Sequence, residues 1–563
     1  MTATDRSDPA RRVLDGFERA SRRPITAAGA LASASALLWI GQAWFAADLI
    51  GALVHNEASF ERALLAVAIF VVLGLLRHAG EFSAGRLAFR TAQRIVAERR
   101  RALVDSESLA SPFAVAPGSS ASVATLIGTK LDLLVPWLTR YRLAAIKVAV
   151  VPLAILLAAA VWSWAAGLIL LASGPLIPLF MALIGFAARE ASERHMAETG
   201  TLNVMLLEWL NAGADIRLLN AEGATVAGFD AAADSLRARS MAVLRIAFLS
   251  STVLELFSAL GIALAAVYVG FSLLGAFSFG TYSTPLTVTG GIFILLLVPD
   301  FFQPLRELAA AWHDRAAALA VAGEIAEHED RTGTRILGRG GKAEPLAGAP
   351  TIAVRDLAFA TSAGRAMRFP DFTAAAGEKL AITGESGAGK TTLLGLIAGF
   401  MAPSAGTVTV AGVPLDGAAA DGWRQRIGYV GQHPHMLNAS LRVNVALNDA
   451  RADPRKLVAA LQAAAAEDIL AGLPTGVETR LGENGAGVSG GEARRLTIAR
   501  AVYAGVDVIL ADEPTADLDS ATADKVADAL IAAAKNGASL IVATHDPRLA
   551  ARMDREIKLA VAP

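Results

Sequence analysis

The sequence GESGAGKT at residues 384–391 decides the fold of the C-terminal part of the chain. It matches the pattern G-x-x-x-x-G-K-[ST], follows the β-branched run KLAIT and opens the helical stretch TLLGLIAGF. Backbone N–H groups of such a loop bind phosphate oxygens together with the N-terminus of the following helix, which predicts bound ATP and Mg²⁺. The predicted nucleotide contacts are Gly384, Glu385, Ser386, Gly387, Ala388, Gly389, Lys390, Thr391 and Thr392.

A second motif, VILADE at residues 508–513, ends an apolar strand in two carboxylates. Asp512 would hold hydrated Mg²⁺ together with the Thr391 hydroxyl, and Glu513 would polarise an attacking water. An isolated acidic pair at a strand end is often only a helix cap, but the phosphate loop upstream favours the catalytic interpretation. From residue 351 onward, short β-branched runs alternate with Ala/Leu-rich helical stretches, which predicts an α/β domain with a largely parallel sheet.

The N-terminal half is apolar. Of the 563 residues 54% are hydrophobic and only 18% are charged, with a mean hydropathy of +0.47. Soluble proteins carry about 25% charged residues, so this deficit predicts membrane spans. Stretches of about 20 apolar residues are long enough to span. Six candidates are found, at 26–50, 62–80, 143–161, 163–187, 244–273 and 285–303.

Basic residues indicate the orientation of these spans. The connections 86–101 and 189–241 are rich in arginine, whereas 274–284 has no charged residue. Because cytoplasmic loops carry the excess of Lys and Arg, we expect both termini and the ATPase to be cytoplasmic. The first 25 residues are polar and arginine-rich and lack the features of a cleavable signal peptide. Three segments are predicted: a transmembrane domain at 1–328, a linker at 329–350 and an ATPase domain at 351–563.

Composition excludes several kinds of chemistry. The chain contains no cysteine, so disulfides, thiolate metal sites and cysteine nucleophiles are excluded. A formal net charge of −1 gives no reason to expect a nucleic-acid partner.

Further motifs resemble those of the ABC transporter family. VSGGE at 488–492 resembles the LSGGQ signature, Gln432 the Q-loop glutamine, GENG at 482–485 the exporter X-loop, ADLD at 516–519 the D-loop, and His545 the switch histidine. The resemblance implies a six-helix all-α exporter-type (type I exporter) transmembrane domain and an α/β P-loop nucleotide-binding domain. It also implies an obligate dimer.

Roles carried over from the family complete the predicted ATP site. Lys390, Glu513 and His545 would be catalytic, and Gln432 would join Thr391 and Asp512 at Mg²⁺. The signature residues Ser489, Gly490, Gly491 and Glu492 would act in trans on nucleotide bound by the partner. Two departures stand out: Thr361 replaces the usual A-loop tyrosine, and the signature opens with Val488 and ends in Glu492. They suggest a heterodimer with unequal sites.

The membrane half resembles a narrower family, the CydD subunits of the CydDC transporters of cytochrome bd assembly. The stretches GQAWFAADLI, GPLIPLFMALIG, VLRIAFLSSTVLELFSALGIALAAVYVGF and LLVPDFFQPLRELAAAWHDRAAAL carry this resemblance, which runs along nearly the whole chain. It implies a heterodimer with a CydC-like subunit among the lipids of the bacterial inner membrane, export of glutathione and cysteine to the periplasm, and haem binding. It also suggests residues 203–220 as the segment that contacts the ATPase.

Candidate cargo or haem residues are the charged and titratable positions near the membrane, namely Arg77, His78, Arg306 and His313. His313 follows FFQPLR and is a candidate haem ligand, and Arg77 would suit a carboxylate of glutathione or a haem propionate. Alternatively, Arg77 pairs with Glu81 one turn on, and His313 lies beyond the membrane. On a continuous helix, Arg306 and His313 would share a face.

Several functions remain open. An ATP-driven thiol exporter is favoured, with haem as regulator or ligand. A haem transporter, a lipid or drug exporter, and a non-transporting membrane ATPase are the alternatives. Six spans exclude a soluble ABC ATPase that acts on nucleic acid.

Overall fold

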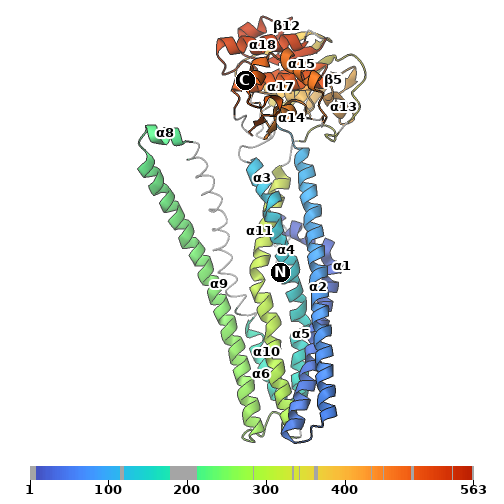
Figure 1. Ribbon diagram of the computed structural model, residues 1–563, viewed down its shortest axis with the longest axis vertical. Helices are drawn as coiled ribbons and strands as arrows, with labels where there is room; N and C mark the ends of the chain where they lie inside the picture. The colour runs from blue at the N-terminus through green and yellow to red at the C-terminus, as the bar shows by residue number, and fades with distance from the viewer. Residues whose placement is uncertain are drawn as a thin grey trace. The chain divides into compact units, whose positions relative to one another are not determined.

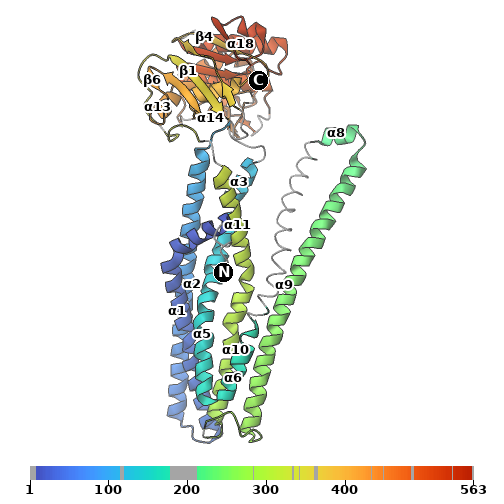
Figure 2. The same cartoon turned by 180° about the vertical axis from the view of Figure 1, so that it is seen from behind.

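The computed structural model shows two compact units (Figures 1 and 2). It describes residues 8–560 except 114–118, 178–179, 181–208, 210–211, 332–334, 361–365, 483–486, 535–536 and the single positions 283, 342, 433, 448 and 450. One unit comprises Met1–Leu103 and Ser120–Asp330, and the other comprises Val104–Ser119 and Arg331–Pro563. The short segment after the second helix therefore belongs to the C-terminal unit.

The first unit is helical. Its described elements are α1 (Pro9–Val54), α2 (Phe60–Ser108), α3 (Ser119–Gly128), η2 (Lys130–Leu133), α4 (Leu134–Pro136), η3 (Trp137–Tyr141), α5 (Arg142–Trp162), α6 (Trp164–Ser173), α8 (Gly213–Leu218), α9 (Glu222–Leu273), α10 (Val288–Ala310) and α11 (Trp312–Arg331). Among the described residues, five helical segments are long and apolar enough to cross a membrane, at Pro9–Val54, Phe60–Ser108, Lys130–Trp162, Thr252–Leu273 and Val288–Glu329.

Five of the six predicted spans overlap these segments. The remaining one, at 163–187, is described as the short apolar helix α6 and a few residues after it, and most of its second half lies outside the described residues. The expected break at Trp162-Ser163-Trp164 is present, because α5 ends at Trp162 and α6 begins at Trp164. Ser163 closes this corner: its Oγ donates to the carbonyl of Gly280 at 2.7 Å and lies 2.8 Å from the Tyr268 hydroxyl.

Apolar packing holds α1, α5, α6, α9 and α10 together (Figure 1). The shared core contains Ile155, Leu170, Val269, Leu297 and Phe302, each at most 2% exposed. By contrast, α2 presents leucines and valines that are more than half exposed, including Leu64, Leu65, Val71 and Leu75. An apolar exposed face suits lipid or a partner helix rather than water. At 49 residues α2 is about 70 Å long, more than twice the hydrocarbon thickness of a bilayer.

The second unit is built around a five-stranded parallel sheet in the order β12-β4-β11-β10-β7. An antiparallel sheet in the order β2-β1-β5-β6, with β3 also paired to β1, and a short β8-β9 pair complete the strands. Their bounds are β1 (Ile352–Ala360), β2 (Ala366–Arg368), β3 (Phe372–Ala374), β4 (Lys379–Thr383), β5 (Ala405–Val410), β6 (Val413–Pro414), β7 (Ile427–Val430), β8 (Ala439–Ser440), β9 (Arg480–Leu481), β10 (Val508–Asp512), β11 (Ser539–Ala543) and β12 (Arg555–Lys558).

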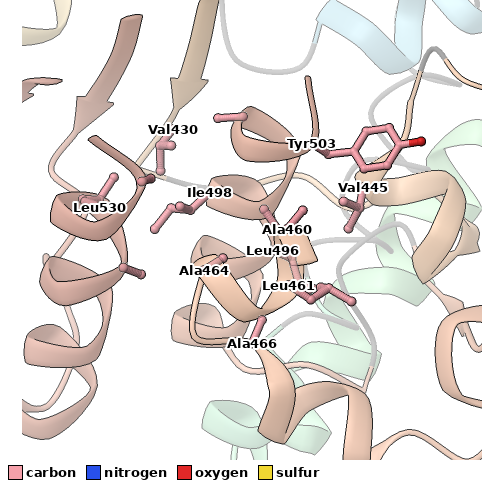
Figure 3. Close-up of a cluster of buried hydrophobic side chains, with 14 of the residues drawn as sticks. Val430, Val445, Ala460, Leu461, Ala464, Ala466, Leu496, Ile498, Tyr503 and Leu530 are labelled. Carbon is pink, nitrogen blue, oxygen red and sulfur yellow. The ribbon is translucent and has the colours of Figure 1, made fainter. Parts of the chain in front are cut away.

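Helices cover the parallel sheet. They are α12 (Lys390–Ile397), α13 (Ala420–Arg424), α14 (Leu441–Val445), α15 (Pro454–Ala463), α16 (Glu467–Gly472), η4 (Gly476–Glu478), α17 (Gly490–Ala504), α18 (Ser520–Ala534) and α19 (Pro547–Ala550). Figure 3 shows Ile498 of α17 facing Val430 of β7 and Leu530 of α18, with Leu461 of α15 beside Leu496 of α17. Strands β10 and β11 are buried along their whole length, as expected for a sheet covered on both faces.

The predicted linker is attached to the C-terminal unit through backbone hydrogen bonds. Leu337 N–H donates to Gly399 O and Leu346 N–H to Gly422 O. The Asp421 carboxylate accepts from the backbone N–H groups of Arg339 and Gly340. Within the predicted linker 329–350, the residues around 337–346 therefore pack against this unit.

Candidate nucleotide-binding site

Three neighbouring strands bring the predicted phosphate-binding and catalytic residues to one edge of the parallel sheet. Strand β11 lies between β4 and β10 in parallel register, with Ala543 opposite both Ile382 and Asp512. The loop after β4, the acidic pair at the end of β10 and His545 after β11 therefore lie together. Ligands of open α/β sheets bind at this carboxyl edge.

The loop 384–389 requires its glycines. Gly387 and Gly389 have φ values of +81° and +93°, which side chains other than glycine rarely adopt. A Cβ on Gly384 would lie 2.8 Å from the carbonyl oxygen of Leu559. Helix α12 begins directly after Gly389, so its free N–H groups and positive dipole end face the loop. This geometry suits a bound phosphate.

Lys390 lies within this loop and is only 7% exposed. Its ammonium donates to the carbonyls of Gly384 at 2.9 Å and Glu385 at 3.3 Å. It also forms an ion pair with Glu513, with Nζ and Oε1 3.2 Å apart. The predicted phosphate-binding cation and the predicted catalytic carboxylate are thus in direct contact.

The predicted Mg²⁺ ligand Asp512 is 3% exposed. Burial raises its pKa, and the neighbouring Glu513 charge acts in the same direction, whereas Thr391, Tyr429 and Lys390 act to lower it. Its Oδ1 atom is buried without a hydrogen-bond partner in the described part of the chain. A buried carboxylate oxygen that lacks a donor and lies near Thr391 fits Mg²⁺, which binds through one or two protein oxygens together with phosphate oxygens.

Mg²⁺ at this site would be bound partly by phosphate oxygens of the nucleotide. The described residues contain no cluster of three His, Asp or Glu side chains able to hold a metal alone. When bound, Mg²⁺ neutralises charge on the phosphates.

Glu513 connects the loop to His545. Its Oε2 lies 2.8 Å from the Nδ1 atom of His545 and also accepts the backbone N–H of His545 at 3.3 Å. Its backbone has a φ of +45°, which costs energy for a residue other than glycine, and its N–H donates to the carbonyl of Ala543. The surrounding strands hold the carboxylate in this position, 9% exposed, at the sheet edge.

The signature residues form the start of α17. The Ser489 hydroxyl accepts the Glu492 N–H at 3.4 Å, and the Glu492 carboxylate accepts the Ser489 N–H at 2.6 Å. This reciprocal pair is a capping box, which gives the departure Glu492 a structural role that the S-x-x-E spacing could have indicated. Gly491 packs so closely against Thr522 that a Cβ would lie 2.4 Å from its methyl group.

Among the described residues, Ser489 and Glu492 bond to each other, whereas Lys390 pairs with Glu513. The signature therefore forms a separate cluster from the phosphate loop. Gln432 follows β7, and Ala516–Asp519 follows Glu513. Thr361 and most of the X-loop lie outside the described residues.

Tyr429 belongs to the site but was not predicted from sequence. Its hydroxyl donates to Oδ2 of Asp512 at 3.4 Å, and burial together with the Asp512 charge raises the tyrosine pKa. The ring contacts Phe113 and Phe400 edge-on at centroid distances of 6.1 Å. Its place in the strand IGYV, just before Gln432, was the available signal, because alternate side chains of paired strands lie on the same face of the sheet.

Replacing Tyr429 with Phe should make ATP hydrolysis more sensitive to acid. The hydroxyl donates to ionised Asp512 and so lowers the pKa of that carboxyl; without it, this pKa rises further above its ordinary value. If ionised Asp512 binds Mg²⁺, activity will then be lost at a higher pH, while the rate at alkaline pH stays near that of the wild type. ATPase rates measured against pH at limiting and saturating Mg²⁺ test this expectation.

Tyr503→Phe provides the control, because the Tyr503 hydroxyl bonds to Asp449 rather than to the site. Superimposable pH profiles for the wild type and Tyr429→Phe would contradict the role given to Tyr429.

The candidate cargo residues do not form one cluster. Arg77 pairs with Glu81 at 3.7 Å and with Asp300 of α10 at 3.7 Å, and its guanidinium lies 5.2 Å from the Trp39 ring centroid. Its Nε atom is buried and has no hydrogen-bond partner among the described residues. His78 is exposed, and its Nδ1 lies 2.9 Å from the carbonyl of Gly74 on its own helix.

The helix on which Arg306 and His313 were expected to share a face is interrupted by a one-residue turn. Helix α10 ends at Ala310 and α11 starts at Trp312, with Ala311 forming a turn between them. Arg306 donates to Gln303 at 2.9 Å, whereas His313 is exposed on α11. The proposed ATPase-contacting stretch 203–220 is described only at 209 and 212–220, where it includes helix α8.

Both halves of the chain match families of known proteins. Residues 25–296 match the family model of the ABC transporter transmembrane region, and residues 368–516 match the ABC transporter model. The chain is 35% identical over 534 residues to the glutathione/L-cysteine transport system ATP-binding/permease protein CydD of Escherichia coli (strain K12), which covers 93% of this chain and 89% of that protein.

Two further relatives are informative. The glutathione/L-cysteine transport system ATP-binding/permease protein CydC of Bacillus subtilis (strain 168) is 25% identical, covering 87% of this chain and 83% of that protein. The structure of a bacterial Atm1-family ABC exporter with ATP bound superposes with a TM-score of 0.71 at 21% identity, covering 96% of this chain and 94% of that one. These matches confirm the predicted fold class, a helical exporter domain joined to an α/β nucleotide-binding domain.

Proposed function

Because this chain belongs to the CydD family of ABC transporters, we propose that it exports glutathione and cysteine from the cytoplasm to the periplasm for cytochrome bd assembly. The chain is an ATPase coupled to transport across a membrane. The observation that carries the cargo proposal is the 35% identity, over nearly the full chain, to a protein named for glutathione and cysteine transport.

The proposed working unit is a heterodimer with a CydC-like chain in the bacterial inner membrane. The likeness to both CydD and CydC proteins supports such a pair. The arginine-rich connections 86–101 and 189–241 support a cytoplasmic ATPase with both termini on the same side. The signature cluster at Ser489, separate from this chain's own phosphate loop, would then serve nucleotide held by the partner.

The proposed hydrolysis uses the contacts at the sheet edge. The 384–389 loop and the start of α12 would bind the phosphates, with Lys390 shifting from Glu513 onto the terminal phosphate. Glu513, held by His545, would accept hydrogen bonding from the attacking water and take its proton. Gln432, Thr391 and Asp512 would complete the Mg²⁺ shell. In such a reaction catalysis comes mainly from positioning and charge neutralisation.

ATP-dependent uptake into inverted membrane vesicles tests the proposal. Vesicles containing this chain and its CydC-like partner should accumulate labelled glutathione and cysteine when ATP is supplied, and vesicles with Lys390→Ala should not. Absence of uptake in wild-type vesicles that hydrolyse ATP would contradict thiol export.

Arg77 is the proposed anchor for a cargo carboxylate. Its ion pairs with Glu81 and Asp300, at 3.7 Å each, are longer than hydrogen bonds, so the guanidinium retains donors for a ligand. Arg77→Ala should raise the KM for glutathione about tenfold, since a charge-assisted hydrogen bond contributes roughly 1.5–3 kcal/mol. The KM of Arg77→Lys should lie between those of the wild type and Arg77→Ala, because lysine keeps the charge but lacks the forked donors of the guanidinium.

Arg62→Ala is the matched control for Arg77→Ala. Arg62 lies on the same helix and pairs with Asp48 through two contacts of 2.9 and 3.0 Å, away from Arg77. An unchanged KM in Arg77→Ala, or an equal rise in Arg62→Ala, would contradict the anchor.

Haem is the second candidate ligand, and His313 is the observation that favours it. The imidazole is exposed on α11 and is free to act as an axial ligand, which neutral histidine does readily. Haem-loaded vesicles in the uptake experiment separate the two ligands. ATPase activity that responds to haem without thiol uptake would move the assignment to haem transport or to a non-transporting role.

A further inference from the structure

Arg494 lies inside the ATPase unit and forms no ion pair with any of the described carboxylates. It is on the first turns of α17, just after the signature residues, and is only 4% exposed. Its Nη1 donates to the carbonyl of Ala516 at 2.5 Å, and its Nη2 donates to the carbonyl of Gln432 at 3.0 Å. No described carboxylate forms an ion pair with it, and its Nε is buried without a hydrogen-bond partner among the described residues.

Burial of this charge is energetically unfavourable. Burial lowers the pKa of Arg494, and the nearby Asp517 charge offsets this only in part. Carbonyl oxygens satisfy two donors but do not neutralise the cation, so an apolar side chain of the same size would cost less to bury. The two carbonyl contacts are the features of Arg494 that an apolar side chain could not replace.

Those contacts join three segments of the predicted ATP site. Gln432 follows β7 and is the predicted Mg²⁺ ligand. Ala516 closes the turn after Glu513, because its N–H donates to the carbonyl of Glu513 at 3.2 Å. Arg494 thus holds the carbonyl of the Gln432 segment and the turn after Glu513 against the helix that begins with Ser489.

The arrangement matters because these segments would serve different nucleotides. Under the proposed function, Ser489 acts on nucleotide bound by the partner, whereas Gln432 and Glu513 act on nucleotide bound by this chain. The planar guanidinium of Arg494 bonds to the Gln432 segment and to the turn after Glu513 and fixes them to the signature helix. A displacement of the helix or of these segments is therefore transmitted to the other.

We propose that Arg494 is a positioning residue that couples the two composite ATP sites of the heterodimer, by fixing the signature helix to the Gln432 segment and to the turn after Glu513. The proposal rests on the dimeric ATPase part of the proposed function, and is independent of whether the cargo is a thiol or haem. Loss of the side chain leaves the phosphate loop and Lys390 untouched, so nucleotide binding to this chain is preserved while hydrolysis is impaired.

The neighbouring Arg495 provides a matched control. It is equally buried, at 4% exposed, and on the same helix, but it pairs with the carboxylate of Asp468 at 2.7 Å and donates to the carbonyl of Ala465, neither of which belongs to the predicted ATP site. Arg495→Met removes a buried arginine without separating the three segments.

The experiment uses the purified heterodimer with Arg494→Met, Arg494→Lys or Arg495→Met in this chain. We expect Arg494→Met to lower kcat for ATP about tenfold with KM within about twofold, in the range of measured coupling effects. Arg494→Lys should recover part of kcat, because an ammonium can donate to both carbonyls. Arg495→Met should lower the thermal unfolding midpoint and leave kcat per folded molecule unchanged.

Occlusion of a photoreactive ATP analogue distinguishes coupling from a local effect, because the two chains can be separated after labelling. Arg494→Met should reduce occlusion on both this chain and its partner. Reduced occlusion on one chain alone would overturn the proposal. So would a kcat of Arg494→Met equal to that of the wild type, or a decrease in kcat that matches the decrease in the folded fraction. Thiol uptake can fail without affecting any of these readouts, so the two proposals fail separately.

Discussion

Replacing Glu513 with Gln should lower the rate of ATP hydrolysis by the assembled transporter about a hundredfold or more, the usual effect of removing a positioned general base. The substitution keeps the shape of the side chain and its site beside His545, but the amide cannot take a proton from water. The carboxylate is well prepared for this role, since Oε2 lies 2.8 Å from His545 and Oε1 lies 3.2 Å from Lys390. ATP binding should persist, because the loop 384–389 is unchanged.

Single-turnover hydrolysis and equilibrium binding of a fluorescent ATP analogue separate these two effects. Glu478→Gln is the control, because Glu478 is a surface carboxylate that pairs with Arg442. We expect the control to hydrolyse ATP at the wild-type rate. Hydrolysis by Glu513→Gln within about threefold of the wild type would show that another group activates the water, since general-base contributions are far larger than this.

The ATP site was largely predictable because its motifs are local in sequence. Gly384–Thr391 specifies a turn that only glycines can adopt and a helix start, and VILADE specifies a buried strand that ends in acids. A parallel sheet then brings the ends of β4, β10 and β11 together without further information. The pairing of Lys390 with Glu513 and of Glu513 with His545 follows from this topology.

Contacts between residues distant in sequence could not be predicted. Arg494 bonds to carbonyls 22 and 62 positions away, and any basic residue in the run ARR would have fitted the same pattern. The Arg77–Glu81 pair was predicted from the i,i+4 spacing as the alternative to a cargo contact. The contacts of Arg77 with Asp300 and Trp39, by contrast, come from helix packing. The turn at Ala311 lies in the run LAAAW, which contains no glycine or proline to indicate it.

The amphipathic character of the membrane helices was a weak guide to their surroundings. Leucine and valine are exposed on α2 but buried on α10. The same residue types suit both places because lipid and the interior of a helix bundle are equally apolar. Sequence therefore predicted the spans but not which of their faces are buried in the bundle.

Replacing Lys390 with Ala should abolish ATP-dependent transport chiefly by weakening nucleotide binding. A charge-assisted contact to phosphate is worth roughly 1.5–3 kcal/mol, so we expect the dissociation constant of ATP to rise at least about tenfold. Lys379→Ala is the matched control, since Lys379 lies at the start of β4 and pairs with Asp554 at 3.0 Å. Equilibrium binding of the same fluorescent analogue measures both variants, and an unchanged affinity in Lys390→Ala would contradict the assignment.

The Lys390 substitution also removes the cation beside a carboxylate that is only 9% exposed, which should destabilise the ATPase unit. The double variant Lys390→Ala/Glu513→Gln separates the two consequences. If the ion pair matters for stability, the double variant will regain much of the thermal unfolding midpoint lost by Lys390→Ala, because no unpaired buried charge remains. Its affinity for ATP should stay low, because the phosphates still lack their cation. Recovery of binding together with the midpoint would mean that Lys390 supports the fold of the site rather than the phosphates.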